Sequence, residues 1–271
     1  MPENLPKPEP DRLSALTALV LLTYGLVRMV VLPSVETELE ILGLFIKIEF
    51  KTQSVMLILA AALAAAGTDW LIQAHPKIHQ KRASAESWVI PGMAALAVGV
   101  IIIRIQAGPP LWIGLLLGAL LLVAVCTAEF IVSYIPDPRY ELVANILLGL
   151  ALLLLTAAFT TIYVSQVRAL FAIPLIFSAS FVISWRLFRL NFPTRRVWPW
   201  AILISSITSQ IAIGLHYWPL SALRMSLILG LSHYLGYHLI ASHLIREIDR
   251  KSMLENTVVG VVALLAILGL T

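Results

Sequence analysis

Long apolar runs, separated by short polar connectors, fill most of this chain. A helix needs roughly 20 apolar residues to cross a hydrocarbon core of about 30 Å, because it must satisfy its backbone hydrogen bonds internally. The pattern therefore predicts an all-α fold, a polytopic transmembrane bundle of eight or nine helices. The nine runs lie at residues 13–33, 53–74, 88–106, 111–135, 141–164, 168–186, 198–217, 219–244 and 254–271.

The connectors are too short to hold a soluble domain. We expect residues 1–12 to form a cytoplasmic N-terminal tail and residues 13–271 to form a single transmembrane domain. The tail lacks the cationic start and the small-residue cleavage site of a secretory signal, so we expect it to be retained. No internal repeat is visible, which argues against a transporter built from two inverted halves.

Composition and charge agree with a membrane location. Hydrophobic residues make up 59% of the chain, charged residues make up 13%, and the mean hydropathy is +0.91. An inside N-terminus leaves thirteen of the nineteen lysines and arginines on the cytoplasmic side, where such residues concentrate. Anionic lipids beside these connectors explain the net charge of +4, so we expect membrane lipids as partners and no nucleic acid. The thirteen residues are Lys7, Arg12, Lys77, Lys81, Arg82, Arg139, Arg186, Arg189, Arg195, Arg196, Arg246, Arg250 and Lys251.

The first outer loop, residues 36–51, alternates charged and apolar residues with a period of two. Such alternation is typical of strands, and its parity switches across positions 42–43. A two-residue turn there would pair Leu39 with Ile46 and put the apolar partners on one face, as in a β-hairpin. A structured loop without strands is the alternative, and a flat amphipathic helix fits less well. The hairpin would offer a docking surface for a protein partner at residues 36–51.

Four polar residues on four spans fall at similar depths in the predicted inner leaflet. An ionisable group at a span centre costs about 2.5–3.5 kcal/mol, so each such residue suggests a function. We hypothesise that they form an inward-facing polar pocket. The alternative is that each one pairs separately or is neutralised, since a carboxyl in a low dielectric stays protonated. The four residues are Asp69, Glu129, Asn145 and His238.

The stretch SHYLGYHLIASH places three histidines in one predicted span. At about 100° per residue, His233, His238 and His243 point to three sides of the helix, so they cannot share one metal. Bis-histidine haem ligation would need a second inward histidine at matching depth, and His216 lies nearer the outer surface. We therefore expect no cofactor.

Small and polar residues on this span and on the preceding one predict a hydrogen-bonded interhelical seam, because small residues permit close helix approach. A proton relay through His233 and Tyr237 remains the alternative. The seam residues are Ser205, Ser209 and His216 on the first span and Ser226, His233 and Tyr237 on the second.

Metal binding and catalysis lack their usual motifs. His75 and His79 have the spacing that chelates zinc on a helix, but Pro76 interrupts that helix and no third ligand is nearby, so solvation is the alternative that we favour. Cys126 is the only cysteine, which excludes an internal disulfide and a multi-cysteine site. Neither G-x-S-x-G nor H-E-x-x-H nor a P-loop occurs. We expect no metal, and the balance leans away from an enzyme.

The sequences ELEILGLFIKIEF and GTDWLIQAHP, within residues 36–76, resemble a pattern in an uncharacterised family of bacterial polytopic membrane proteins. The resemblance implies a multi-helix membrane domain but no activity. Together with the charge bias, it suggests the bacterial inner membrane. Our leading interpretation is a non-enzymatic scaffold or subunit of a cell-envelope assembly. The alternatives are a transporter of lipid or small molecules that uses the inner polar pocket, and a lipid-modifying enzyme.

Overall fold

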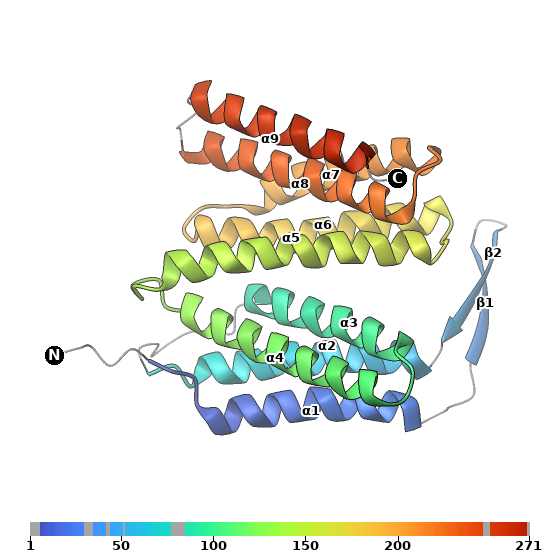
Figure 1. Cartoon of the computed structure of the whole chain (residues 1–271), viewed down its shortest axis with the longest axis vertical. Coiled ribbons are helices and arrows are strands. Elements are labelled where there is room, and N and C mark those ends of the chain that lie inside the picture. Colours follow the sequence, from blue (N-terminus) through green and yellow to red (C-terminus); the bar gives the residue numbers. More distant parts are fainter. Residues whose placement is uncertain are drawn as a thin grey trace. The chain divides into compact units, whose positions relative to one another are not determined.

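The computed structural model describes residues 6–29, 35–41, 44–50, 52–76, 85–245 and 250–269. In these ranges the chain forms nine α-helices, one short 3-10 helix (η1) and two strands (Figure 1). The helices are α1 (Pro10–Met29), α2 (Thr52–Gln73), η1 (Ala85–Trp88), α3 (Val89–Arg104), α4 (Pro109–Val132), α5 (Tyr140–Val164), α6 (Ala169–Asn191), α7 (Trp198–His216), α8 (Ala222–Ile245) and α9 (Arg250–Gly269).

Six helical segments in the described ranges are long and apolar enough to cross a membrane. They are α2, η1 with α3, α4, α5, α6 and α7. The chain is therefore a multi-pass, all-α membrane protein, as its apolar runs predict. Crossing by α1, α8 and α9 stays a prediction, and the apolar part of α9, Val258–Ile267, is short.

The segment between α1 and α2 contains strands β1 (Val35–Ile41) and β2 (Leu44–Phe50). They pair antiparallel in a two-stranded sheet, with Leu39 opposite Ile46 (Figure 1). This register is the one that a turn at positions 42–43 would give, and those two positions lie outside the described residues. A protein partner at this loop stays a prediction.

The chain forms two compact units, Met1–Val143 and Ala144–Thr271. In the first unit, α2 packs against α1, α3 and α4. The Tyr24 hydroxyl of α1 donates a hydrogen bond of 2.6 Å to the Ala95 carbonyl of α3, which ties these two helices together. The expectation of a single transmembrane domain stays a prediction. Leu16, Leu71, Cys126 and Phe130 form a buried cluster in the first unit.

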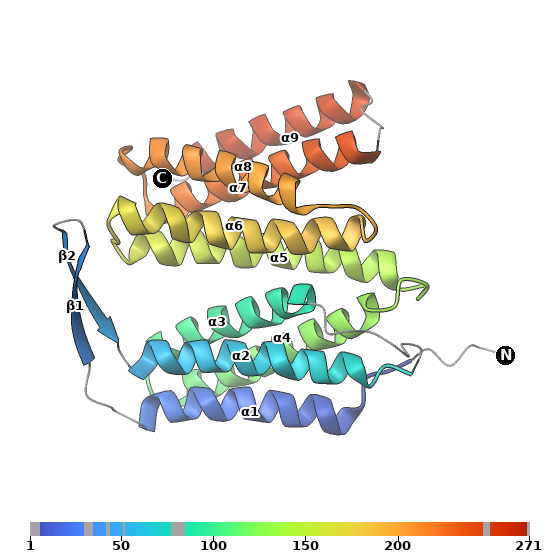
Figure 2. The ribbon, with the colours of Figure 1, turned by 180° about the vertical axis from the view of Figure 1, so that it is seen from behind.

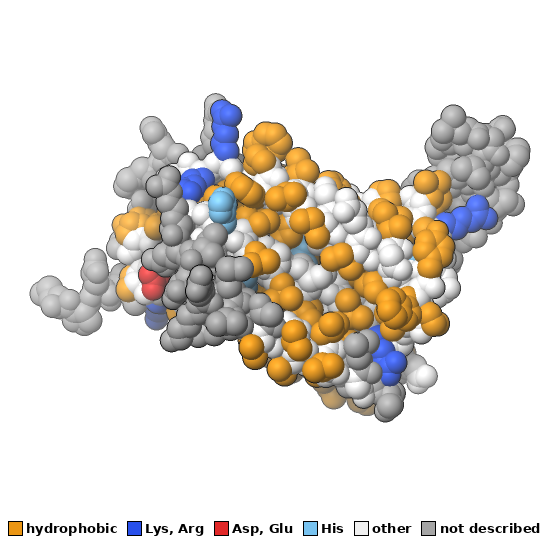
Figure 3. Space-filling model, turned by 90° about the horizontal axis from the view of Figure 1, so that it is seen from above, with side chains coloured by type: hydrophobic (Ala, Val, Ile, Leu, Met, Phe, Trp, Pro, Cys, Tyr) orange, Lys and Arg blue, Asp and Glu red, His pale blue; other side chains and the backbone are white. Residues whose placement is uncertain are grey.

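In the second unit, α6 packs against α7 and α8, and α8 also packs against α7 and α9. Figures 1 and 2 show these helices from opposite sides. A Cβ atom added to Gly230 of α8 would overlap the Thr156 side chain of α5, so a glycine is needed at this approach. Figure 3 shows hydrophobic side chains across the middle of the viewed face, with most of the coloured basic side chains toward its ends. Lipid can solvate such a surface, whereas water cannot do so cheaply.

Candidate functional site

The predicted polar pocket draws on both units. Asp69 and Glu129 belong to Met1–Val143, whereas Asn145 and His238 belong to Ala144–Thr271. Asp69 is half-buried and accepts a hydrogen bond of 2.7 Å from Gln73 Nε2, while Glu129 is fully buried. Each unit holds two of the four residues, so the pocket as a whole stays a prediction.

The two members in the second unit have different surroundings. Asn145 is exposed on α5. His238 is half-buried on α8, with its ring centroid 4.5 Å from that of Tyr234. Neither lines the cavity described below.

Three of the predicted seam residues do share one face of α8. We call Ser226, Gly230, His233 and Tyr237 the α8 polar line. Its hydroxyls and ring are hydrogen-bonded mainly to α5 and α6. Ser226 accepts a hydrogen bond of 2.7 Å from Thr160 of α5. At the other end, the Tyr237 hydroxyl bonds with Asn191 of α6 and lies 3.5 Å from the Leu187 carbonyl.

His233, at the centre of the line, is fully buried and bonds on both sides. Its Nε2 lies 3.0 Å from Ser184 Oγ of α6, and its Nδ1 lies 3.1 Å from Thr208 Oγ1 of α7. The Thr208 hydroxyl donates its hydrogen to the Ile204 carbonyl at 2.9 Å, so its oxygen accepts from His233. This assignment puts the hydrogen of the neutral imidazole on Nδ1 and leaves Nε2 to accept from Ser184.

The predicted stripe on α7 has a smaller part in this network. Ser205 donates within its own helix, to the Ala201 carbonyl at 2.7 Å. Ser209 Oγ is buried without a hydrogen-bond partner among the described residues. Sequence reasoning missed the partners Thr160, Ser184 and Asn191. The spacing of Ser180 and Ser184, one helical turn apart on α6, was a signal that could have identified this face.

A partly enclosed cavity of about 260 Å³ lies entirely within the second unit. The C-terminal end of α5, the N-terminal end of α6, the C-terminal end of α7 and the N-terminal end of α8 surround it. Its polar lining residues are Tyr163, Gln166, Arg168, His216 and Ser226, and apolar side chains supply the rest. No Asp or Glu occurs among the described residues that line it.

The α5–α6 connection forms the polar side of this cavity. Gln166 has φ of 51°, a left-handed conformation that is unfavourable for a residue with a side chain. Gln166 lies two residues after the end of α5 at Val164, and Arg168 is the N-cap residue of α6. The first N–H groups of a helix have no intrahelical partner and carry partial positive charge. Arg168 and the start of α6 therefore place positive potential beside the cavity.

A second polar cluster lies in the first unit, at the connection between α4 and α5. The buried Asp137 carboxylate forms an ion pair of 2.8 Å with Arg139, which also donates a 3.0 Å hydrogen bond to the Pro6 carbonyl of the N-terminal tail. The hydrogen bond from the Arg139 side chain holds the pKa of Asp137 below its usual value. This cluster ties the tail to the α4–α5 connection.

The structure buries His75, which contradicts the expectation that it is solvated. Its ring packs 4.6 Å from the ring of Phe130 and 5.6 Å from that of Tyr134, measured between centroids. His79 lies outside the described residues. Within the described ranges, no three His, Cys, Asp or Glu residues are grouped so that they can hold a metal ion.

The family model described as "Protein of unknown function (DUF5656)" matches residues 32–270. The match includes almost all of the second unit and the part of the first unit that follows α1, with the segment that carries the sequence resemblance. No curated protein and no solved structure matches the chain.

Proposed function

We propose that this chain, which belongs to the family of unknown function DUF5656, binds an anionic amphiphile of the phospholipid class in its second unit. The observation that carries the proposal is the cavity between α5, α6, α7 and α8. It combines a cationic polar side with an apolar remainder, inside a chain that has six candidate membrane spans.

The polar side of the cavity suits an anionic headgroup. Arg168 presents a guanidinium whose fork of donors matches phosphate oxygens, and the start of α6 adds unpaired backbone N–H groups. Tyr163 and His216 add further hydrogen-bonding groups, with ring centroids 6.5 Å apart. Because no carboxylate lines the cavity among the described residues, nothing there repels a bound anion.

The apolar remainder suits acyl chains. Ile173 and Ile176 of α6 and Leu229 of α8 are among its apolar lining residues. A volume of about 260 Å³ is just under the range of about 300–1,000 Å³ that is usual for a whole small-molecule ligand. The cavity therefore suits one part of a larger molecule, and a phospholipid can leave its chains in the surrounding bilayer.

The distribution of basic residues supports an outer location for this cavity. The opposite end of the second unit carries arginines at the end of α6 and in the α6–α7 connection, and Arg195 donates a 2.9 Å hydrogen bond to the Leu244 carbonyl of α8. Basic residues favour the cytoplasmic side, which supports a cytoplasmic N-terminus and an inner-membrane location. The proposed ligand then comes from the outer leaflet.

The proposed role is binding without catalysis. It keeps the non-enzymatic character of our leading sequence interpretation and adds a ligand, as the transporter alternative does. The proposed ligand site lies in the second unit alone. The proposal therefore does not depend on the predicted pocket of Asp69, Glu129, Asn145 and His238. If the chain is a subunit of a cell-envelope assembly, its contribution would be to hold a lipid there.

The test compares three probes on the purified full chain in a neutral detergent. Dioctanoyl phosphatidylglycerol should raise the melting temperature, because a ligand that binds only the folded state stabilises it by about 2.7 kcal/mol at one hundred times its Kd. Dioctanoyl phosphatidylcholine has the same chains with a zwitterionic headgroup and should have a much smaller effect. Glycerol phosphate supplies the anion without chains and distinguishes a headgroup site from a lipid site.

Two variants address the cavity directly. Arg168→Gln should weaken phosphatidylglycerol binding about tenfold or more, and Ile173→Trp should block the apolar side. Arg224→Gln removes a charge from the same end of the unit, at a residue that does not line the cavity, and should leave binding unchanged. Equal stabilisation by both lipids, or equal loss in both arginine variants, would overturn the proposal.

A further inference from the structure

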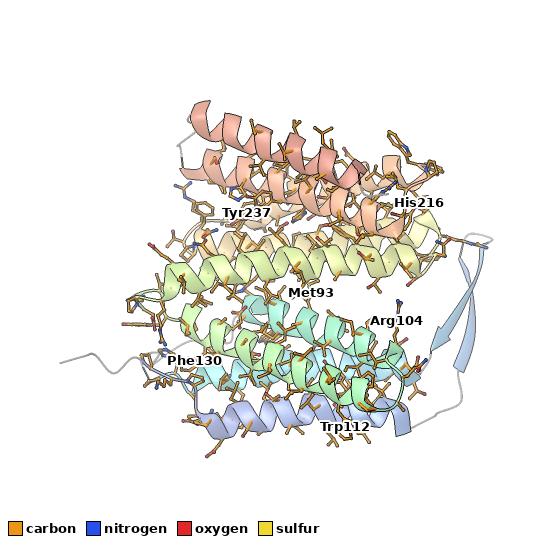
Figure 4. The ribbon with its side chains drawn as sticks, viewed as in Figure 1. Met93, Arg104, Trp112, Phe130, His216 and Tyr237 are labelled. Atoms are coloured by element: carbon orange, nitrogen blue, oxygen red, sulfur yellow. The ribbon has the colours of Figure 1, made fainter. Side chains whose placement is uncertain are left out.

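We propose that the second unit contains a proton path along the α8 polar line, with His233 as its central carrier. This function goes beyond ligand binding and does not depend on it. The path begins at the cavity, which Ser226 lines, and ends beside Tyr237. Figure 4 labels His216 of the cavity and Tyr237, and they lie at opposite ends of this helical unit.

The polar groups of the path follow one face of α8 at successive turns. With a rise of about 1.5 Å per residue, His233 lies about 10 Å along the axis from Ser226 and about 6 Å from Tyr237. Thr160 accompanies Ser226, Ser184 and Thr208 accompany His233, and Asn191 accompanies Tyr237. These gaps are short enough for one or a few waters to bridge.

Two buried hydroxyls point to such waters. Ser180 Oγ and Ser209 Oγ are buried and have no hydrogen-bond partner among the described residues. A buried hydroxyl without a hydrogen-bond partner is unfavourable, and buried water usually satisfies such groups. Ser180 lies one turn before Ser184 on α6, and Ser209 follows Thr208 on α7, so both flank the partners of His233.

The hydrogen bonds of His233 allow a proton to enter and leave by different nitrogens. The incoming proton passes from a water to Ser184 Oγ while the Ser184 hydroxyl hydrogen moves to Nε2, which gives an imidazolium. The Nδ1 hydrogen then moves to Thr208 Oγ1, while the Thr208 hydrogen leaves the Ile204 carbonyl for the next water toward Tyr237. One proton has entered and one has left, and a half-turn of the neutral ring directs its N–H toward Thr208 and its bare nitrogen toward Ser184 again.

Among the residues of α6, α7 and α8 that the structure describes, no other buried group can take this role. Helices α6, α7 and α8 contain no Asp or Glu. Of the ionisable groups on these helices, Arg186 holds its proton permanently, and His238 lies on another side of α8 and is half-buried. Tyr237 faces the same line as His233 but gives up a proton only at high pH in water. Ionisable residues of this kind inside a membrane characteristically mark proton relays.

The test measures proton flux in vesicles of phosphatidylcholine, which contain no anionic lipid ligand. The purified full chain is reconstituted with a trapped pH-sensitive dye, the membrane potential is clamped with potassium and valinomycin, and a pH step is applied. Wild-type vesicles should equilibrate at least fivefold faster than protein-free vesicles. His233→Phe should reduce the rate to the protein-free level, while the matched variant His238→Phe should retain it.

A second variant keeps the test valid if His233→Phe does not fold. The double variant S180A/S209A removes only the two unpartnered hydroxyls, and it should lower the flux at least threefold with an unchanged elution volume in gel filtration. The proposal is overturned if wild-type vesicles equilibrate no faster than empty ones, or if the folded variants conduct like the wild type. Phosphatidylglycerol binding, measured separately in detergent, tests the cavity and has no bearing on this result.

Discussion

The Asp137–Arg139 ion pair is a site where we expect a single substitution to change the stability of the protein. The Asp137 side chain is 1% exposed and the Arg139 side chain is 30% exposed, so the two charges are desolvated unequally. Removing a charge partner from a buried carboxylate costs more than removing both charges. The pair also holds the Pro6 carbonyl, so it links the N-terminal tail to the α4–α5 connection.

We expect Arg139→Ala to destabilise the protein by about 2–4 kcal/mol, more than Asp137→Asn, because it leaves a buried carboxylate unpaired. The folded pKa of Asp137 is lowered, so its contribution is complete above the unfolded pKa of about 3.9 and is lost as the pH falls through the folded pKa. The stability difference between wild type and Asp137→Asn should thus shrink below about pH 4. Thermal melts in detergent between pH 3 and 7 measure it, and a pH-independent difference would contradict the assignment.

Gln166 has a backbone conformation that costs about 1–2 kcal/mol for a residue with a side chain and nothing for glycine. We therefore expect Gln166→Gly to stabilise the protein by about 0.5–1 kcal/mol, since glycine also raises the entropy of the unfolded chain. The exposed neighbour Ser165 serves as the control, and Ser165→Gly should not stabilise. Chemical denaturation of both variants provides the comparison, and a destabilised Gln166→Gly would show that its side chain has an essential contact.

The burial of His75 shows where residue-level prediction from sequence failed. Its neighbours in the sequence are Pro76 and Lys77, which suggest a solvated loop. The rings of Phe130 and Tyr134 pack against it, and both residues are far from His75 in the sequence. Local polarity carries no information about such contacts.

At the level of the helices, the apolar runs predicted the bounds well. The run at 53–74 became α2, Thr52–Gln73, and the run at 141–164 became α5, Tyr140–Val164. This agreement arises because a membrane span requires a continuous apolar helix, and composition alone reveals it. Periodicity also identified the face shared by Ser226, His233 and Tyr237. It did not identify their partners, because a helical face does not specify which neighbour packs on it.

The packing of α4 against α3 gives an element-level prediction. A Cβ atom on Gly118 would lie 2.5 Å from Val98 Cγ1, and a β-branched valine has little rotamer freedom with which to move away. Gly118→Ala should therefore cost about 1–3 kcal/mol through overpacking. Gly149 of α5 has nothing within 4 Å of the added Cβ, so Gly149→Ala should be neutral or stabilise by up to about 1 kcal/mol. Melting temperatures of the two variants compare them, and equal effects would contradict the close helix approach.

For the whole molecule, the sequence predicted an all-α, multi-pass protein, and the family match covers residues 32–270. The sequence could suggest the pocket of Asp69, Glu129, Asn145 and His238, but it could not establish that these four side chains meet. Similar depth in a bilayer fixes one coordinate of a side chain and leaves its position in the membrane plane open. Only helix packing determines that position, and these residues belong to two separate units.

The proposed orientation of the second unit rests on the charges at its two ends, and the proposed outer-leaflet ligand depends on it. Ser165, at the cavity end, and Thr194, at the arginine-rich end, are both exposed and flank α6, which is a candidate span. In intact cells, a membrane-impermeant maleimide should label Ser165→Cys, and it should label Thr194→Cys only after permeabilisation. The native Cys126 is buried and serves as the background. The reverse labelling pattern would place the cavity at the cytoplasmic face, where the ligand would come from the inner leaflet and the inside bias of the arginines would fail.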